Sequence, residues 1–164
     1  MAQYKLELAM KRFIAAGIAC LIPAGAALAQ TQTPTGEWRV KDGTADIRVV
    51  DCSGSMWGVI AWTKGPANNT DTDKNNPDPA LRNRPVVGLP ILIDMKPAEG
   101  RWEGSVYNAE NGKTYDSNIS LVSPDVLQIE GCVLGFLCGG ENWTRVPLPK
   151  GAPTDQAVCA KLAK

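Results

Sequence analysis

The residues that could carry covalent chemistry in this 164-residue chain are its cysteines, because the chain contains no histidine. The absence of histidine excludes Ser-His-Asp and Cys-His catalysis and any His-ligated metal site. Four of the five cysteines follow the apolar N-terminal segment, namely Cys52, Cys132, Cys138 and Cys159. They lack the C-x-x-C spacing of a zinc site, and an even number of cysteines in an exported chain favours two disulfides. We therefore expect no metal ligands.

Three pairings of these four cysteines are possible. Cys132 and Cys138 flank a glycine-containing loop and could bridge it locally, which would leave Cys52 to pair with Cys159. The second bridge would tie the C-terminal tail to the rest of the fold. Because it closes such a long loop, it would stabilise the protein by about 4 kcal/mol in the chain-entropy model.

Paired carboxylates are another route to catalysis. Glycoside hydrolysis needs two facing acids about 5–10 Å apart, and the acids available on candidate strands are Asp46, Asp94, Glu103 and Asp116. Each is better explained as the solvent-side residue of an alternating strand. The sequence has no nucleophile elbow and no glycine-rich phosphate loop. We therefore predict no catalytic residues, no cofactor and no enzymatic activity, with a hydrolase of envelope saccharides as a third-ranked alternative.

A polar segment carries the beginning of a calcium-binding pattern. Asp71, Asp73 and Asn75 alternate as the first three oxygen ligands of such a loop would. Asn76 then stands where the sharp glycine turn belongs, and Arg82 stands where the bidentate Glu should be. The segment is therefore interpreted as a solvated polar loop.

Arg82 and Arg84 follow in the same region and are candidate ligand contacts. Their guanidinium groups could bind a carboxylate or phosphate, or they could pair with Asp73 and Asp78. Internal pairing that fixes the loop is the preferred interpretation. The stretch from Pro79 to Asn83 could form one helical turn, with Asp78 as its N-cap.

Aromatic residues supply two further sets of candidates. Trp38 and Arg145 lie in the first and last candidate strands, and a guanidinium stacked on an indole would contribute about 0.5–2 kcal/mol and close one end of a barrel. The aromatic candidates for ligand contact are Trp57, Trp62, Trp102 and Tyr107. Packing in the core is the alternative interpretation for each tryptophan, Trp143 included.

The elements that must position these residues are eight short strands. The candidate strands are Glu37–Lys41, Ala45–Asp51, Met56–Thr63, Pro90–Met95, Arg101–Asn108, Lys113–Ser120, Val126–Gly131 and Glu141–Pro147. Several alternate with period two, and Asp42-Gly43 and Asn111-Gly112 are strong hairpin signals. Short connections require antiparallel neighbours, and closure removes exposed edges. The sequence therefore predicts an all-β, eight-stranded, antiparallel up-and-down barrel.

Two segments interrupt this pattern. The connection from Lys64 to Val87, between the third and fourth strands, is long and rich in Asn, Asp and Pro, and we expect it to lie near the barrel mouth. After Arg145 the tail is rich in Pro and Gly, and is then briefly helical near Asp155–Leu162.

The N-terminal segment resembles a secretory signal. Lys11-Arg12 precedes an apolar stretch from Phe13 to Leu28, and Ala27-Leu28-Ala29 fits the cleavage rule, so the mature chain would begin at Gln30. A membrane anchor and, because of Cys20, a lipoprotein are the alternatives. The expected organisation is a signal peptide over residues 1–29, a barrel domain over 30–147 and a C-terminal tail over 148–164. The expected location is the bacterial periplasm or the exterior.

The charge of the mature chain limits its partners. Removal of the signal leaves 14 basic and 16 acidic residues without a block of like charge. Nucleic acid and stable membrane insertion are therefore not expected. A small molecule of unknown identity is the expected partner, and a protein partner is possible.

Several short motifs occur in the order seen in one family of exported bacterial proteins, domain-of-unknown-function family 2147. The motifs are Gly36-x-Trp38, Asn76 to Arg82, Arg84-Pro85, Gly88 to Pro90, Trp102 to Gly104, Val106 to Asn108, Asn111 to Tyr115 and Trp143 to Arg145. The resemblance implies a lipocalin-like barrel with a small internal cavity, export, small-ligand binding and no assigned enzymatic activity. Family members often carry a second cysteine five residues after the first, where this chain has Trp57.

Together these patterns predict an exported periplasmic protein that binds a small apolar or amphipathic ligand in a barrel cavity. The alternative is a non-enzymatic structural or interaction module of the envelope, with the barrel filled by side chains. Eight strands enclose space for either packed side chains or one small ligand, so both hypotheses stay open at the level of sequence.

Overall fold

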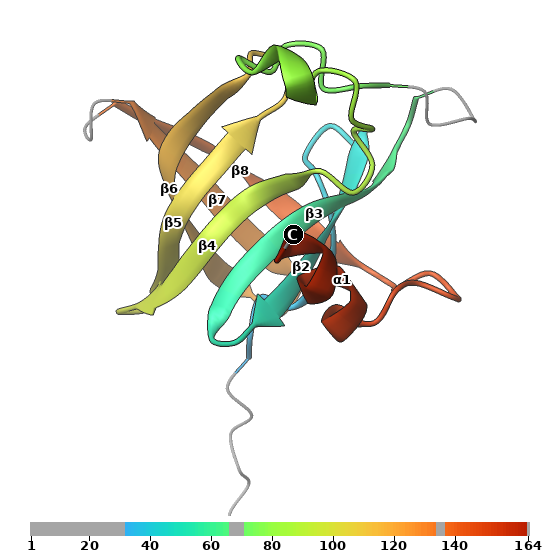
Figure 1. The fold of residues 1–164 in the computed structure, drawn as a ribbon. Helices are drawn as coiled ribbons and strands as arrows, with labels where there is room; N and C mark the ends of the chain where they lie inside the picture. The colour runs from blue at the N-terminus through green and yellow to red at the C-terminus, as the bar shows by residue number, and fades with distance from the viewer. Residues whose placement is uncertain (1–31, 66–70, 134–136, 164) are drawn as a thin grey trace, which may run out of the picture. The chain divides into compact units, whose positions relative to one another are not determined.

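The computed structural model describes residues 32–65, 71–133 and 137–163. Eight antiparallel strands form a closed barrel in sequence order, which confirms the predicted up-and-down barrel (Figure 1). The strands are β1 (Gly36–Arg39), β2 (Ala45–Cys52), β3 (Ser55–Thr63), β4 (Pro90–Ala98), β5 (Arg101–Asn108), β6 (Lys113–Ser123), β7 (Val126–Val133) and β8 (Leu137–Val146). The signal-peptide prediction, residues 1–29, lies outside the described residues.

Two ends of the barrel can be distinguished. The first, here called the Trp38 end, is where β1 begins and β8 ends, and Trp38 pairs in register with Arg145 there. The second, here called the loop end, carries the β1–β2, β3–β4, β5–β6 and β7–β8 connections. The β3–β4 connection contains the 3-10 helix η1 (Pro79–Leu81), which Asp78 caps by accepting a hydrogen bond from the Ala80 amide.

The core is densely packed toward the Trp38 end. Inward-facing side chains there are completely or almost completely buried: Trp38, Ile47, Val49, Leu92, Met95, Ile119 and Leu127. These residues follow the period-two alternation read from the sequence, because successive strand residues face opposite sides of the sheet. The buried core is therefore concentrated in that half of the barrel.

Closure at the Trp38 end combines stacking with hydrogen bonds. The guanidinium carbon of Arg145 lies 4.1 Å from the centroid of the Trp38 ring. Arg145 also donates to the carbonyl oxygens of Thr35 (2.8 Å) and Pro124 (2.7 Å), and the Trp38 indole donates to the Pro34 carbonyl (2.7 Å). The pair therefore joins the first and last strands and anchors the segment before β1.

The last strand begins earlier than the sequence indicated. β8 starts at Leu137 rather than Glu141, because Gly139 and Gly140 continue the β7–β8 ladder instead of forming a loop. Cys132 and Cys138 are consequently direct cross-strand partners and form one disulfide. The other disulfide joins Cys52 to Cys159.

The outer wall of the barrel is covered on one side by the C-terminal helix α1 (Asp155–Leu162), which lies over β2 and β3 (Figure 1). Val158 of α1 packs against Val50 and Val59, two outward-facing residues of these strands. The expectation that Asp46 faces solvent was wrong: Asp46 is buried because Arg39 bonds both of its carboxylate oxygens.

Among the residues that the structure describes, no helix is long and apolar enough to cross a membrane.

Candidate functional site

The barrel has a hollow at its loop end, with a volume of about 380 Å³. It lies on the inward face of the second half of the sheet, from β5 to β8. The residues that border it are Val106, Asn108, Tyr115, Ile129, Gly131, Val133, Leu137, Gly139, Gly140, Glu141 and Trp143. We call this space the lumen hollow.

A cross-strand pair of glycines creates the hollow. Gly131 of β7 lies opposite Gly139 of β8, and both face inward in register with Ile129 and Glu141. A Cβ atom added at Gly139 would meet no atom within 4 Å, whereas one added at Gly131 would lie 3.3 Å from Val106 Cγ1, so the free space lies on the Gly139 side. Because neither residue has a side chain, the layer of core side chains stops here and the lumen opens.

The hollow is mostly apolar but contains one carboxylate. Glu141 accepts a hydrogen bond of 2.5 Å from the indole Nε1 of Trp143, which lies two residues further along β8. The indole thereby orients the carboxylate on the inward face. A second lone-pair direction of Glu141 can accept a hydrogen bond from a bound molecule.

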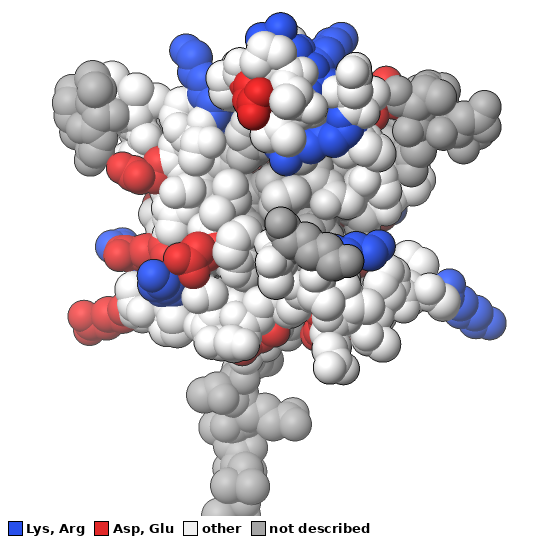
Figure 2. Space-filling model, in the orientation of Figure 1, with Lys and Arg blue, Asp and Glu red and all other residues white. Residues whose placement is uncertain are grey.

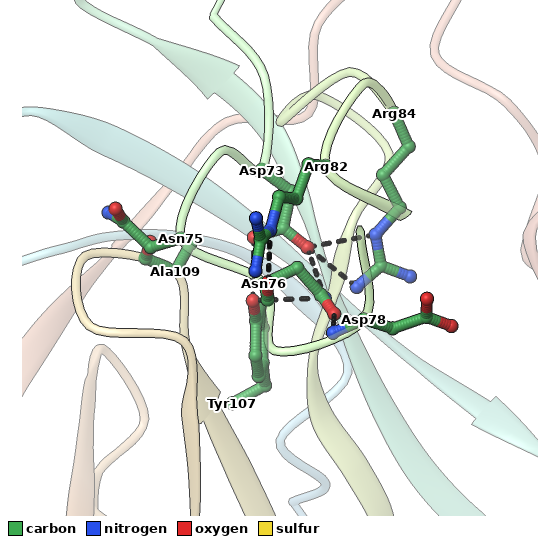
Figure 3. A network of polar contacts seen from close by, with 8 residues as sticks. All are labelled: Asp73, Asn75, Asn76, Asp78, Arg82, Arg84, Tyr107 and Ala109. Atoms are coloured by element: carbon green, nitrogen blue, oxygen red, sulfur yellow. Dashed lines mark hydrogen bonds and ion pairs between the residues drawn. The ribbon is translucent and has the colours of Figure 1, made fainter. Parts of the chain in front are cut away.

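A buried polar network holds the β3–β4 connection at the same end of the barrel (Figure 3). At its centre is Asp73, which is fully buried. One Asp73 oxygen accepts from the Tyr107 hydroxyl (2.6 Å), and the other accepts from the Asn76 amide (2.7 Å) and the Arg84 Nε (2.9 Å). The Arg84 guanidinium also lies 5.8 Å from the Tyr107 ring centroid. Asp73 is therefore a structural anchor in this fold.

The network shifts the titration of its two acidic groups. Burial on its own would raise the pKa of Asp73, but hydrogen bonds from Tyr107 and Asn76 and the contact with Arg84 outweigh it, so the pKa of Asp73 lies below its usual range. Burial, followed by the neighbouring Asp73, raises the pKa of Tyr107. Asp73 is thus held ionised and Tyr107 neutral.

The preferred pairing of the loop arginines is confirmed for Arg84, which forms an ion pair with Asp73. Arg82 instead donates to the backbone carbonyl of Asn76 (2.8 Å). On the far side of the loop, Asn75 donates to the carbonyl of Glu110 in the β5–β6 turn (2.7 Å). A Cβ at Gly112 would lie 1.9 Å from the Asn75 carbonyl oxygen, so this close approach requires glycine.

The aromatic and cationic ligand candidates from the sequence do not converge on one site. Tyr107 faces the opposite side of the sheet from Val106, which borders the lumen hollow, because consecutive strand residues alternate. Trp102 packs against the core. Trp57, Trp62 and Arg84 border a second hollow on the outer wall, with a volume of about 760 Å³. Their roles in ligand contact stay predictions.

Sequence reasoning missed Glu141 and the glycine pair. The signal that could have found them is alternation along β8: an inward Trp143 places Glu141 and Gly139 inward as well. Reading Gly139-Gly140 as a loop hid this relation. Within residues 32–65, 71–133 and 137–163, no group of three or more acidic or cysteine side chains is placed to hold a metal ion.

Comparison with known proteins agrees with this architecture. Residues 36–145 match the family model described as "Uncharacterized protein conserved in bacteria (DUF2147)", and the chain belongs to that family. Among solved structures, the chain is similar to protein HP1028 from the human pathogen Helicobacter pylori, which is described as belonging to the lipocalin family. The two are 22% identical, with a TM-score of 0.63, over 71% of this chain and 84% of the other. No curated protein matches the chain.

Proposed function

We propose that this protein is an exported bacterial carrier or sensor that binds a small apolar or amphipathic molecule in the lumen hollow. The observation that carries the proposal is the facing pair Gly131 and Gly139, which leaves about 380 Å³ unfilled inside an otherwise packed barrel. Sites for small molecules commonly have volumes of about 300–1,000 Å³ and mostly apolar walls. The lipocalin-like fold supports the same role.

The lining favours a ligand with an apolar body and one hydrogen-bond donor. Ile129, Val106 and the Trp143 ring offer apolar contact, while the Glu141 carboxylate offers an acceptor or a negative charge. An amine or a hydroxyl would satisfy Glu141, whereas a second carboxylate would be repelled by it.

The proposal includes no catalytic step. Each of the two hollows is bordered by a single described acid, Glu141 in the lumen hollow and Glu37 in the outer one. Acid–base hydrolysis of a glycoside needs two such groups in one cleft.

Export is supported by the two disulfides, since such bonds persist in oxidising compartments such as the periplasm. The N-terminal residues resemble a signal peptide, as described above.

Native mass spectrometry of protein purified from the periplasm tests the proposal. We expect a discrete extra mass that is lost on denaturation, and we expect Gly139→Leu to abolish it by filling the lumen hollow. Asn142→Leu is the matched control, because Asn142 is exposed on the same strand and faces outward. A bare polypeptide mass for the unmodified protein, together with no displacement of a hydrophobic dye, would contradict the proposal and favour the packed interaction module.

A further inference from the structure

The second hollow lies outside the barrel, between its wall and the C-terminal segment. One side is formed by outward-facing residues of β1 to β3, among them Arg48, Trp57 and Val59. The other side is formed by the segment Pro149–Pro153 and by α1. We call this space the outer groove. Its volume of about 760 Å³ is twice that of the lumen hollow.

The groove has a fixed second wall because α1 is attached to the barrel in three ways. The Cys52–Cys159 disulfide links it to β2, Arg48 forms an ion pair with Asp155, and Val158 is buried against Val50 and Val59. The helix is therefore held at a set position, and the hollow beside it is a built feature of the fold.

The walls of the groove are amphipathic. Trp57, Val59, Val158 and Leu162 provide an apolar surface along the barrel and the helix, and Trp62, at the loop end of β3, is 42% exposed. The Arg39 guanidinium carbon lies 5.4 Å from the centroid of the Trp62 ring. The apolar surface is suited to contact with an apolar chain.

The charged groups that border the groove are mostly basic, namely Arg48, Arg84, Lys150 and Lys161. Figure 2 shows Lys and Arg side chains gathered over the β3–β4 connection at the top of this face. Among the described residues, the one acid bordering the groove is Glu37, which is 3% exposed. Burial, and then the neighbouring Asp46, raises the pKa of Glu37 despite the attraction of Arg48. Because Arg48 and Arg84 each form an ion pair with a carboxylate, the excess positive charge at the groove comes from Lys150 and Lys161.

Arg48 has hydrogen-bonding capacity that the described residues do not use. Its Nη2 bonds Asp155, but its Nε is buried and has no hydrogen-bond partner among the described residues. A buried donor without a partner costs about 1–3 kcal/mol. An anionic group bound beside Arg48 would offset part of that cost.

We propose that the outer groove binds an amphipathic anion, a molecule with an apolar chain and one carboxylate or phosphate head. The apolar chain lies against Trp57, Val59 and Val158, and the head lies among the basic groups. The volume favours a small molecule over a peptide helix, because a ten-residue helix occupies roughly 1,200 Å³. This site is separate from the lumen hollow, whose acid Glu141 favours the opposite charge.

Calorimetric titration of the periplasmic protein, with both disulfides formed, tests the proposal. The probes are dodecanoate and dodecyltrimethylammonium, both below their micelle-forming concentrations, which share a chain and differ in the sign of the head group. We expect saturable binding of dodecanoate about tenfold tighter than that of the cation. No saturable binding, or equal affinity for the two probes, would overturn the proposal.

Variants locate the binding site. The double variant Lys150→Gln/Lys161→Gln should weaken dodecanoate binding about tenfold, because each exposed charge contributes modestly. Lys41→Gln is the matched control, since Lys41 is exposed and does not border the groove. Cys52→Ser/Cys159→Ser should abolish binding by releasing α1, whereas Cys132→Ser/Cys138→Ser should not.

The lumen variant separates this proposal from the proposed function. Gly139→Leu should leave the dodecanoate titration unchanged while removing any copurified ligand. The proposal would be wrong if Gly139→Leu abolished dodecanoate binding while Lys150→Gln/Lys161→Gln had no effect. That result would mean that dodecanoate binds in the lumen hollow.

Discussion

The two hollows of this molecule are built from segments that are related very differently in the sequence. The lumen hollow is lined by β5 to β8, four strands that are consecutive in the sequence. The outer groove joins β1 to β3 with the C-terminal segment, and the cysteines that link its walls are 107 residues apart. The lumen hollow therefore follows from the register of neighbouring strands, whereas the outer groove depends on the long-range contacts that attach α1 to the barrel wall.

The same contrast extends to charge. The lumen hollow presents the carboxylate of Glu141, and the outer groove presents mainly basic groups. If both bind ligands, they bind different ones, because a site that attracts an anion disfavours a cation. A single barrel can thus carry an inner and an outer site without competition between them.

The largest expected effect comes from the two disulfides. Removing Cys52–Cys159 by double serine substitution should lower the free energy of unfolding by about 4 kcal/mol, and removing Cys132–Cys138 by about 2 kcal/mol, because the first closes a far longer loop. Urea unfolding followed by circular dichroism measures both. Equal losses would mean that the Cys52–Cys159 bridge stabilises the fold no more than the local Cys132–Cys138 bridge does.

A smaller effect is expected from the network that holds the β3–β4 connection between the two hollows. Asp73→Asn should destabilise the protein by about 3 kcal/mol, because Arg84 loses its buried partner. Asp71→Asn is the control: Asp71 is exposed two residues away and should change stability by less than about 0.5 kcal/mol. Equal effects of the two substitutions in urea unfolding would show that the network does not stabilise the fold.

The stability that the Asp73–Arg84 ion pair contributes should fall in acid. The pKa of Asp73 is lowered in the folded state, so its contribution to stability is present above its usual value of 3.8 and is lost as pH falls below that value. Asp73→Asn should lack this part of the acid-induced loss.

Local patterns predicted most of the fold, and long-range contacts account for what they missed. Alternation placed Trp38, Ile47 and Val49 inward, and the Asp78–Pro79 signal predicted the helical turn that the structure contains as η1. Burial of Asp46 is an exception, because its partner Arg39 is its direct cross-strand neighbour in the β1–β2 hairpin and bonds both carboxylate oxygens. An outward-facing residue is therefore not always exposed to solvent.

The candidate sites were harder to predict for the same reason. Trp57 and Arg84 are candidate ligand contacts from the sequence, and both border the outer groove. Arg48 and Glu37 were read only as the polar face of alternating strands. They border a groove only because α1 and the Pro149–Pro153 segment form its other wall. The alternation of residues within β1 and β2 does not predict that contact.

The smallest expected effect tests the electrostatics of the groove through Glu37. Its pKa is raised above the ordinary value of 4.5, so folding favours the protonated acid, and stability is lost as pH rises from 4.5 through the raised value. Glu37→Gln keeps the shape without the charge and should raise the free energy of unfolding at pH 7, because it removes the cost of ionising a buried acid. The difference should vanish below pH 4.5, where both side chains are neutral.

Urea unfolding at several pH values measures this difference, with exposed Glu99→Gln as the control. Removing the one acid from the groove should also tighten dodecanoate binding, because Glu37 competes with an anionic head for Arg48. A variant that is less stable than the unmodified protein at pH 7 would show that attraction between Glu37 and Arg48 outweighs the cost of burial. Glu37 and Arg48 would then neutralise each other, and the preference of the groove for an anion would depend on Lys150 and Lys161 alone.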